Sequence, residues 1–167
     1  TIDVTDTNGK SWQFSDSGSV SYSESFTDPA GVCTKHTNTA TITQTGLSDS
    51  VTVEDCQGAD LTVSKTANPA FSRAYKWNIS KSVDKTKVNI LGGTATFNYT
   101  VTVAHDNGTD SGWTVTGKIT VSNPNTWQDV TADVTDAIPG GTCSVSGGSS
   151  VVVPRSDSKT FDYSCTF

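Results

Sequence analysis

Several stretches of the chain alternate apolar and polar residues with a period of two, the pattern of a strand with one buried face. The clearest is residues 94–103, where Phe97, Tyr99 and Val101 fall on one face and mostly threonines on the other. The same alternation occurs in residues 19–26, 71–83, 113–122 and 161–167. Each stretch is therefore predicted to form a strand whose apolar face is buried.

Short clusters of Gly, Pro, Asn and Asp separate these stretches, as at Asn8-Gly9, Asp28-Pro29 and Pro139-Gly140. Such clusters supply the positive φ angles, or the fixed φ of proline, that tight turns need. Thr and Ser are abundant and long-chain helix formers are scarce, so no helix is expected. The pattern predicts an all-β fold of antiparallel, immunoglobulin-like β-sandwich units.

Two short segments recur in the same order along the chain. Residues 1–6 (TIDVTD) resemble residues 131–136 (TADVTD), and the pattern of residues 15–26 resembles that of residues 156–167. The first pair is offset by 130 positions and the second by 141, so the second copy has 11 additional residues between 137 and 155. We interpret the two matches as an internal repeat.

On this interpretation the chain comprises parts of two successive repeat units rather than one whole unit. Residues 1–62 correspond to the C-terminal part of one β-repeat unit, and residues 63–167 to the N-terminal two-thirds of the next. The second copy stops at Phe167, where the first continues into residues 32–56. A sandwich without its last strands exposes sheet edges and an open core. Either a neighbouring unit supplies these strands, or the two parts of one chain pack on each other.

The four cysteines are Cys33, Cys56, Cys143 and Cys165, and their spacing does not fit a zinc motif. The repeat selects one of the three possible connectivities. Cys165 stands where the first copy has Glu24, and Cys143 lies in the segment with the insertion, so both occur only in the second copy. We predict Cys143–Cys165 and, by elimination, Cys33–Cys56. Such disulfides indicate an oxidising, extracellular setting, and reduced thiols are the alternative.

Charge and composition exclude several classes of function. The chain has 17 acidic and 11 basic residues, a net charge of −6, so it repels nucleic acid. It has no apolar run near the ~18 residues that a membrane span needs. It contains two His and no Gly-x-Ser-x-Gly sequence, so we expect neither an enzyme nor a cofactor.

Three segments resemble a known type of repeat: residues 61–69 (LTVSKTANP), 75–79 (YKWNI) and 117–124 (GKITVSNP). They are similar to immunoglobulin-like or prealbumin-like repeats of long bacterial surface proteins, many in families of unknown function. The resemblance covers most of the chain in two out-of-phase parts, and the insertion with Cys143 departs from it. It implies an extracellular, multi-domain fibre, stalk or adhesin protein, and it carries over no catalytic residues.

From the repeat and the resemblance, we expect a structural subunit of an extracellular bacterial fibre or stalk at the cell surface. Its partners would be identical subunits or adjacent repeats, joined into a filament by strand complementation. Residues 1–62 would be the donor region. The acceptor face would be built from residues 71–83, 94–103 and 113–122.

The alternative function is a cell-surface adhesin module that binds Ca²⁺ or a glycan. Asp106, Asn107 and Asp110 offer the hard oxygen ligands that Ca²⁺ prefers, although a turn between strands explains the same residues.

The four tryptophans divide into two pairs. Trp12 and Trp127 are less constrained by strand alternation and would form an exposed platform for glycan stacking. Trp77 and Trp113 lie on the apolar faces of their strands and are expected in the core.

Overall fold

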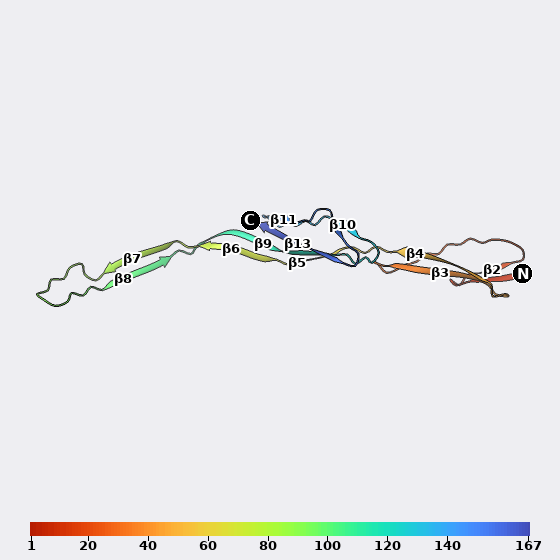
Figure 1. The fold of residues 1–167 in the computed structure, drawn as a ribbon, viewed down its shortest axis with the longest axis horizontal. Helices are drawn as coiled ribbons and strands as arrows, with labels where there is room; N and C mark the ends of the chain where they lie inside the picture. The colour runs from red at the N-terminus through yellow and green to blue at the C-terminus, as the bar shows by residue number, and fades with distance from the viewer. The chain divides into compact units, whose positions relative to one another are not determined.

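A computed structural model describes all residues, 1–167; its strands pair antiparallel and it contains no helix (Figure 1). The strands are β1 (Ile2–Asp6), β2 (Ser11–Phe14), β3 (Cys33–Ile42), β4 (Ser48–Cys56), β5 (Thr62–Lys65), β6 (Asn68–Ala74), β7 (Trp77–Val83), β8 (Tyr99–His105), β9 (Thr109–Ser122), β10 (Val130–Ala132), β11 (Thr142–Val145), β12 (Val151–Val153) and β13 (Ser158–Thr166). Together with two disulfides, these strands confirm the predicted all-β, antiparallel, disulfide-stapled fold.

The chain forms two compact units, each assembled from separate parts of the sequence. Unit 1 comprises residues 1–65, 118–135 and 146–161, and unit 2 comprises residues 66–117, 136–145 and 162–167. The predicted boundary between residues 62 and 63 separates two copies of the sequence repeat, which is a different division from the two compact units. That boundary stays a prediction.

Unit 1 contains a four-stranded sheet in the order β2-β1-β3-β4, which we call the N-terminal sheet. In an antiparallel pair, residues directly opposite each other lie on the same face. Val4 lies opposite both Trp12 and Ile42, and His36 lies opposite Val53. One face of the sheet is therefore mainly apolar. The apolar members of this face are Ile2, Val4, Trp12, Phe14, Ala40, Ile42, Val51 and Val53.

The buried core of unit 1 lies elsewhere, around the C-terminal half of β9. Its apolar members are Ile119, Val121, Val151, Val153 and Phe161. β5 pairs with this half of β9, and β10 pairs with β12. The predicted alternation of 113–122 and of 161–167 is therefore correct, and the apolar faces are covered at residues 119–121 and 161–165, whereas Trp113 and Phe167 are exposed.

Unit 2 is built on a hairpin in which β6 pairs with the N-terminal half of β9, and β7 pairs with β8. β11 pairs with β13 beside it. The sheet order is β11-β13-β9-β5, and β6 also pairs with β9.

Three predicted strands differ from the observed ones. Residues 71–83 form two strands rather than one, residues 94–98 are not in a strand, and residues 19–26 have no strand partner. The break between β6 and β7 has a clear physical cause: two residues, Tyr75 and Lys76, lie opposite three, Asp106 to Gly108. One extra residue in one arm of a hairpin is a β-bulge, and Gly108 adopts a φ of +80° there.

Candidate functional site

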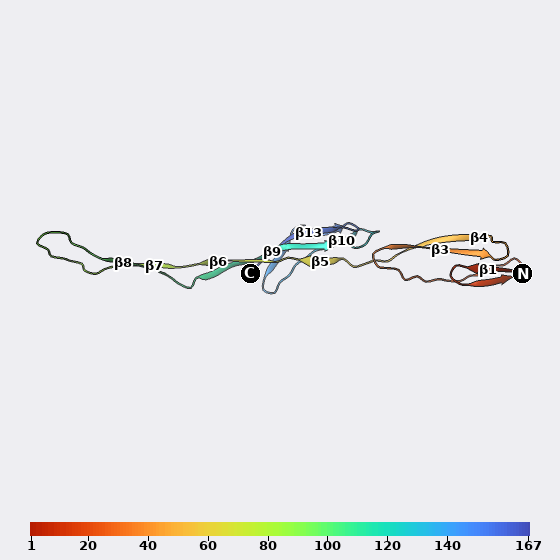
Figure 2. The same ribbon diagram turned by 90° about the horizontal axis from the view of Figure 1, so that it is seen from below.

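Residues 18–29 of unit 1, which we call the open segment, form no strand although their sequence has the strand pattern. None of their backbone groups makes a backbone hydrogen bond, and Figure 2 draws them as a thin line before β3. Their even-numbered side chains meet the apolar face of the N-terminal sheet: Tyr22 donates to the Asp6 carboxylate at 2.7 Å, and the Phe26 and His36 rings stack with centroids 3.8 Å apart. The open segment therefore lies like one strand of a second sheet whose neighbours are absent.

β13, whose side-chain pattern matches that of the open segment, shows how this pattern is buried when flanking strands are present. Tyr163 in β13 is 3% exposed, whereas its counterpart Tyr22 is 42% exposed. Phe161 is 7% exposed and its counterpart Val20 is 43% exposed. β13 lies between β9 and β11, and the open segment lies beside no strand. The same side-chain pattern is thus buried where flanking strands are present and exposed where they are not.

Side-chain bonds hold the open segment in place without any backbone pairing. The hydrogen bond to Asp6 raises the pKa of Tyr22. Asn8 donates from Nδ2 to Glu24 at 2.6 Å, and the Lys10 ammonium lies 3.3 Å from the same carboxylate oxygen. The backbone of the segment is therefore positioned and still free to pair.

The open segment leaves part of the N-terminal sheet uncovered. Val51 and Val53, on edge strand β4, are 67% and 50% exposed. A hollow of about 300 Å³ lies nearby, lined by Val4, Ala40, Thr41, Ile42, Leu47, Ser48 and Asp49. The uncovered apolar face therefore lies beside a segment whose backbone makes no strand pairing.

The second uncovered surface is one face of the β7–β8 ribbon, drawn in green in Figure 1. Ile79 lies opposite Val103, and Lys81 lies opposite Val101 with its ammonium 4.6 Å from the Tyr99 ring centroid. More than half of each of five large side chains on this face is exposed. They are Trp77, Ile79, Tyr99, Val101 and Val103.

The expectation that Trp77 and Trp113 lie in the core is wrong. Trp77 is 63% exposed and Trp113 is 46% exposed, although Trp113 stacks on Phe71 with ring centroids 4.4 Å apart. Both residues do lie on the apolar faces of their strands, but no second layer covers those faces.

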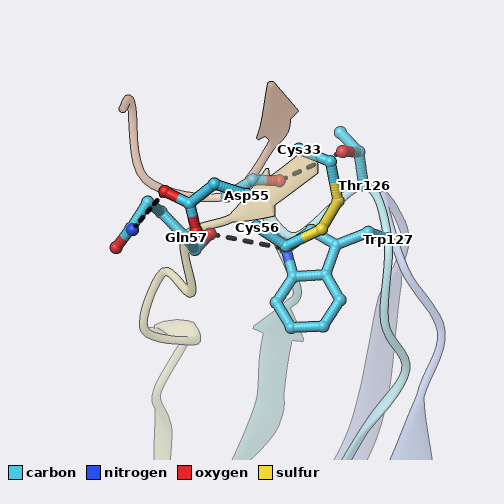
Figure 3. Close-up of a disulfide and its surroundings, with 7 residues drawn as sticks. Cys33, Asp55, Cys56, Gln57, Thr126 and Trp127 are labelled. Carbon is cyan, nitrogen blue, oxygen red and sulfur yellow. Dashed lines mark hydrogen bonds between the residues drawn. A yellow bond between two sulfur atoms is a disulfide. The ribbon is translucent and has the colours of Figure 1, made fainter. Parts of the chain in front are cut away.

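Trp12 and Trp127 are both half-buried, and the structure does not bring them together as a platform. The Trp12 ring lies 5.2 Å from the Tyr22 ring, under the open segment. Trp127 donates from Nε1 to the Gln57 carbonyl at 3.4 Å, and Figure 3 shows its indole beside the Cys33–Cys56 disulfide. Glycan stacking on these residues stays a prediction.

Asp106 and Asn107, two of the three predicted Ca²⁺ ligands, lie in the bulge between β8 and β9, and Asp110 lies at the start of β9. Asp106 accepts hydrogen bonds from the backbone amides of Lys76 and Gly108. Asp110 accepts two hydrogen bonds from Arg73, at 2.5 and 2.7 Å, and this arginine lowers the pKa of Asp110. Asn107 is exposed. The carboxylates thus already have partners in the bulge, and Ca²⁺ binding stays a prediction.

The two disulfides have the predicted connectivity, and each joins neighbouring strands. Cys33–Cys56 links β3 to β4, and Cys143–Cys165 links β11 to β13. β11 lies within residues 137–155, the stretch in which the second sequence match has its 11 additional residues. Asp136 lies beside the second disulfide, but two bonded sulfurs offer no thiolate to a metal ion. The disulfides indicate a non-reducing environment.

None of the elements is a helix with the length and hydropathy needed to cross a membrane.

The sequence pattern indicated strand-like alternation in both the open segment and the β7–β8 ribbon. It did not show that the apolar faces beside them stay uncovered. The repeat interpretation expected exposed sheet edges in residues 63–167, and it did not indicate that residues 18–29 lack flanking strands. No family model, curated protein or solved structure matches the chain. The resemblance to bacterial surface repeats therefore remains a prediction.

Proposed function

We propose that the chain is a structural subunit of an extracellular bacterial fibre or stalk, and that it self-associates through its uncovered strands. The apolar face of the β7–β8 ribbon supports this proposal most directly. An isolated two-stranded ribbon is marginally stable in water, so its apolar face gains stability from a covering layer. Exposed apolar patches of this kind mark interaction sites in soluble proteins.

Three further features fit a fibre subunit at the cell surface. The disulfides suit an oxidising space outside the cell. The Thr- and Ser-rich strands and the internal repeat are typical of extracellular arrays, in which each unit stacks on the next. The sequence has only two His and no Gly-x-Ser-x-Gly elbow, and on this basis we propose a structural role rather than an enzymatic one.

The test is self-association of the purified, oxidised chain, measured by light scattering and by electron microscopy over a range of concentrations. Val103→Lys puts a charge on the apolar face of the ribbon. Thr102→Lys puts the same charge on the opposite face of the same strand and is the matched control. Both positions are exposed, so both variants should fold with stabilities within about 0.5 kcal/mol of the parent chain.

We expect the parent chain and Thr102→Lys to form filaments, and Val103→Lys to need at least roughly tenfold more protein, since burying one valine contributes about 1.5–3 kcal/mol. A parent chain that stays monomeric at every concentration would contradict the proposed function. So would equal assembly by the two lysine variants.

A further inference from the structure

We propose that the open segment of one copy pairs antiparallel with β8 of a second copy, and that the neighbour's β7–β8 ribbon then covers the uncovered part of the N-terminal sheet. This inference rests on the proposed function and names the two strands that meet.

The first support is the pairing already made by β13, whose side-chain pattern matches that of the open segment. β13 runs antiparallel beside β9: Asn123 donates from its backbone amide to Asp157, and Phe167 donates from its amide to Trp113. β8 precedes β9 on the same arm of the hairpin, beyond the bulge. β8 pairs only with β7, so its second edge is unoccupied. A segment with the β13 pattern therefore has a matching edge on β8.

The second support is the direction of the backbone groups of β8. Asp106 donates from its amide to the Lys76 carbonyl, and Asp84 donates from its amide to the Asn98 carbonyl. Even-numbered residues of β8 thus bond toward β7. Backbone groups of successive residues in a strand point to opposite edges. The amides and carbonyls of Tyr99, Val101 and Val103 therefore point to the unoccupied edge.

The third support is agreement between the apolar faces. If the open segment pairs with this edge so that Tyr22 lies opposite Val103, Phe26 lies opposite Tyr99 and Glu24 lies opposite Val101. The large apolar side chains then lie on the side of the N-terminal sheet, and the serines, the threonines and Ala104 lie on the other side. In this register the amide of Glu24 donates to β8.

The fourth support is charge. Residues 1–62 have nine acidic and two basic residues, a net charge of −7, whereas residues 66–117 have five basic and three acidic residues, a net charge of +2. Contact between the first region of one copy and the second region of another is attractive, and contact between two first regions is repulsive. Such a head-to-tail contact uses different surfaces on the two copies, so it repeats into a filament unless it closes into a ring.

The test compares Glu24→Pro with Glu24→Ala. Both variants lose the side-chain contacts to Asn8 and Lys10, but only proline removes the amide and cannot donate to β8. The open segment has no backbone hydrogen bond in the single chain, so proline breaks none there. We expect Glu24→Pro to raise the concentration needed for filaments roughly tenfold or more relative to Glu24→Ala.

A mixing experiment shows whether Glu24→Pro is folded and tests the head-to-tail arrangement. Glu24→Pro keeps an intact β8, and Val103→Lys keeps an intact open segment. We expect a mixture of the two to form a one-to-one dimer in analytical ultracentrifugation, whereas neither variant alone forms it. Absence of that dimer would overturn the proposed pairing.

The failures of the two proposals are distinguishable. If the parent chain assembles and Val103→Lys does not, but Glu24→Pro matches Glu24→Ala, then the fibre proposal stands and the strand assignment is wrong. If the open segment instead pairs with β8 of its own chain, the parent chain stays monomeric, and both proposals fail.

Discussion

At the scale of single residues, the buried amide of Asn125 holds the C-terminal end of β9 to the connection after β4. Asn125 is fully buried, and its Nδ2 donates to the carbonyl of Ala59 and to Oδ1 of Asn123, each at 2.8 Å. Its Oδ1 accepts from the amide of Ala59 at 2.7 Å. A buried polar group is stabilising only while it keeps its hydrogen-bond partners. A residue that cannot make the same hydrogen bonds at position 125 should therefore destabilise the fold.

We expect Asn125→Ala to lower the free energy of unfolding of unit 1 by about 3 kcal/mol, because it leaves the backbone groups of Ala59 without partners. Urea denaturation of the oxidised chain measures this change. Asn107→Ala, at an exposed position, is the control and should change the free energy by less than about 0.5 kcal/mol. Equal effects of the two variants would show that the amide cluster contributes nothing.

At the scale of elements, β9 depends on one glycine for its length of 14 residues. β9 pairs with β5 after Gly117 and with β6 before it, and the two residues that join β5 to β6 run past this glycine along the same edge of β9. A Cβ atom built on Gly117 would lie 2.2 Å from the Thr66 carbonyl oxygen and 2.9 Å from the Tyr163 ring. The backbone of Thr66 would have to move to admit any side chain.

Gly117→Ala should therefore lower the free energy of unfolding by roughly 3 kcal/mol or more, since the clash is with backbone rather than with a flexible side chain. Gly58→Ala is the matched control, because a Cβ atom at Gly58 meets nothing within 4 Å. Thermal unfolding followed by circular dichroism compares the two. Similar melting temperatures would mean that the backbone of Thr66 moves aside easily.

The alternation pattern predicted some of the strands and not others. The alternation in 113–122 and 161–167 predicted β9 and β13, and it predicted the buried faces at residues 119–121 and 161–165, because the partners of both strands lie within the chain. The alternation in 19–26 is equally regular, yet it forms no strand, since periodicity reports which side chains share a face and not whether a neighbour exists. The bulge beside Tyr75 was also beyond prediction, because it depends on the pairing register of two distant segments.

At the scale of the whole molecule, charge is distributed unevenly along the chain. The total of −6 combines an acidic first region with a weakly basic hairpin region. Two copies that met at random would repel each other, whereas the proposed head-to-tail contact brings opposite charges together. The response of assembly to salt separates these two effects.

Raising the ionic strength from about 0.05 to about 0.5 M shortens the screening length from roughly 14 to roughly 4 Å. If attraction between residues 1–62 and 66–117 guides assembly, filaments should form more slowly at high salt. Light scattering over time measures the rate. Faster assembly at high salt would mean that overall repulsion dominates instead.

The disulfides set a limit on how far the chain extends under load. Cys33 and Cys56 are 23 positions apart in sequence, Cys143 and Cys165 are 22 apart, and in each pair the Cα atoms lie 4.0 Å apart. An unfolded stretch of that size would lengthen by roughly 75 Å, at about 3.5 Å per residue. Because each disulfide closes its stretch covalently, tension on the oxidised chain cannot extend either one, and the force passes from strand to strand through the sulfur atoms instead.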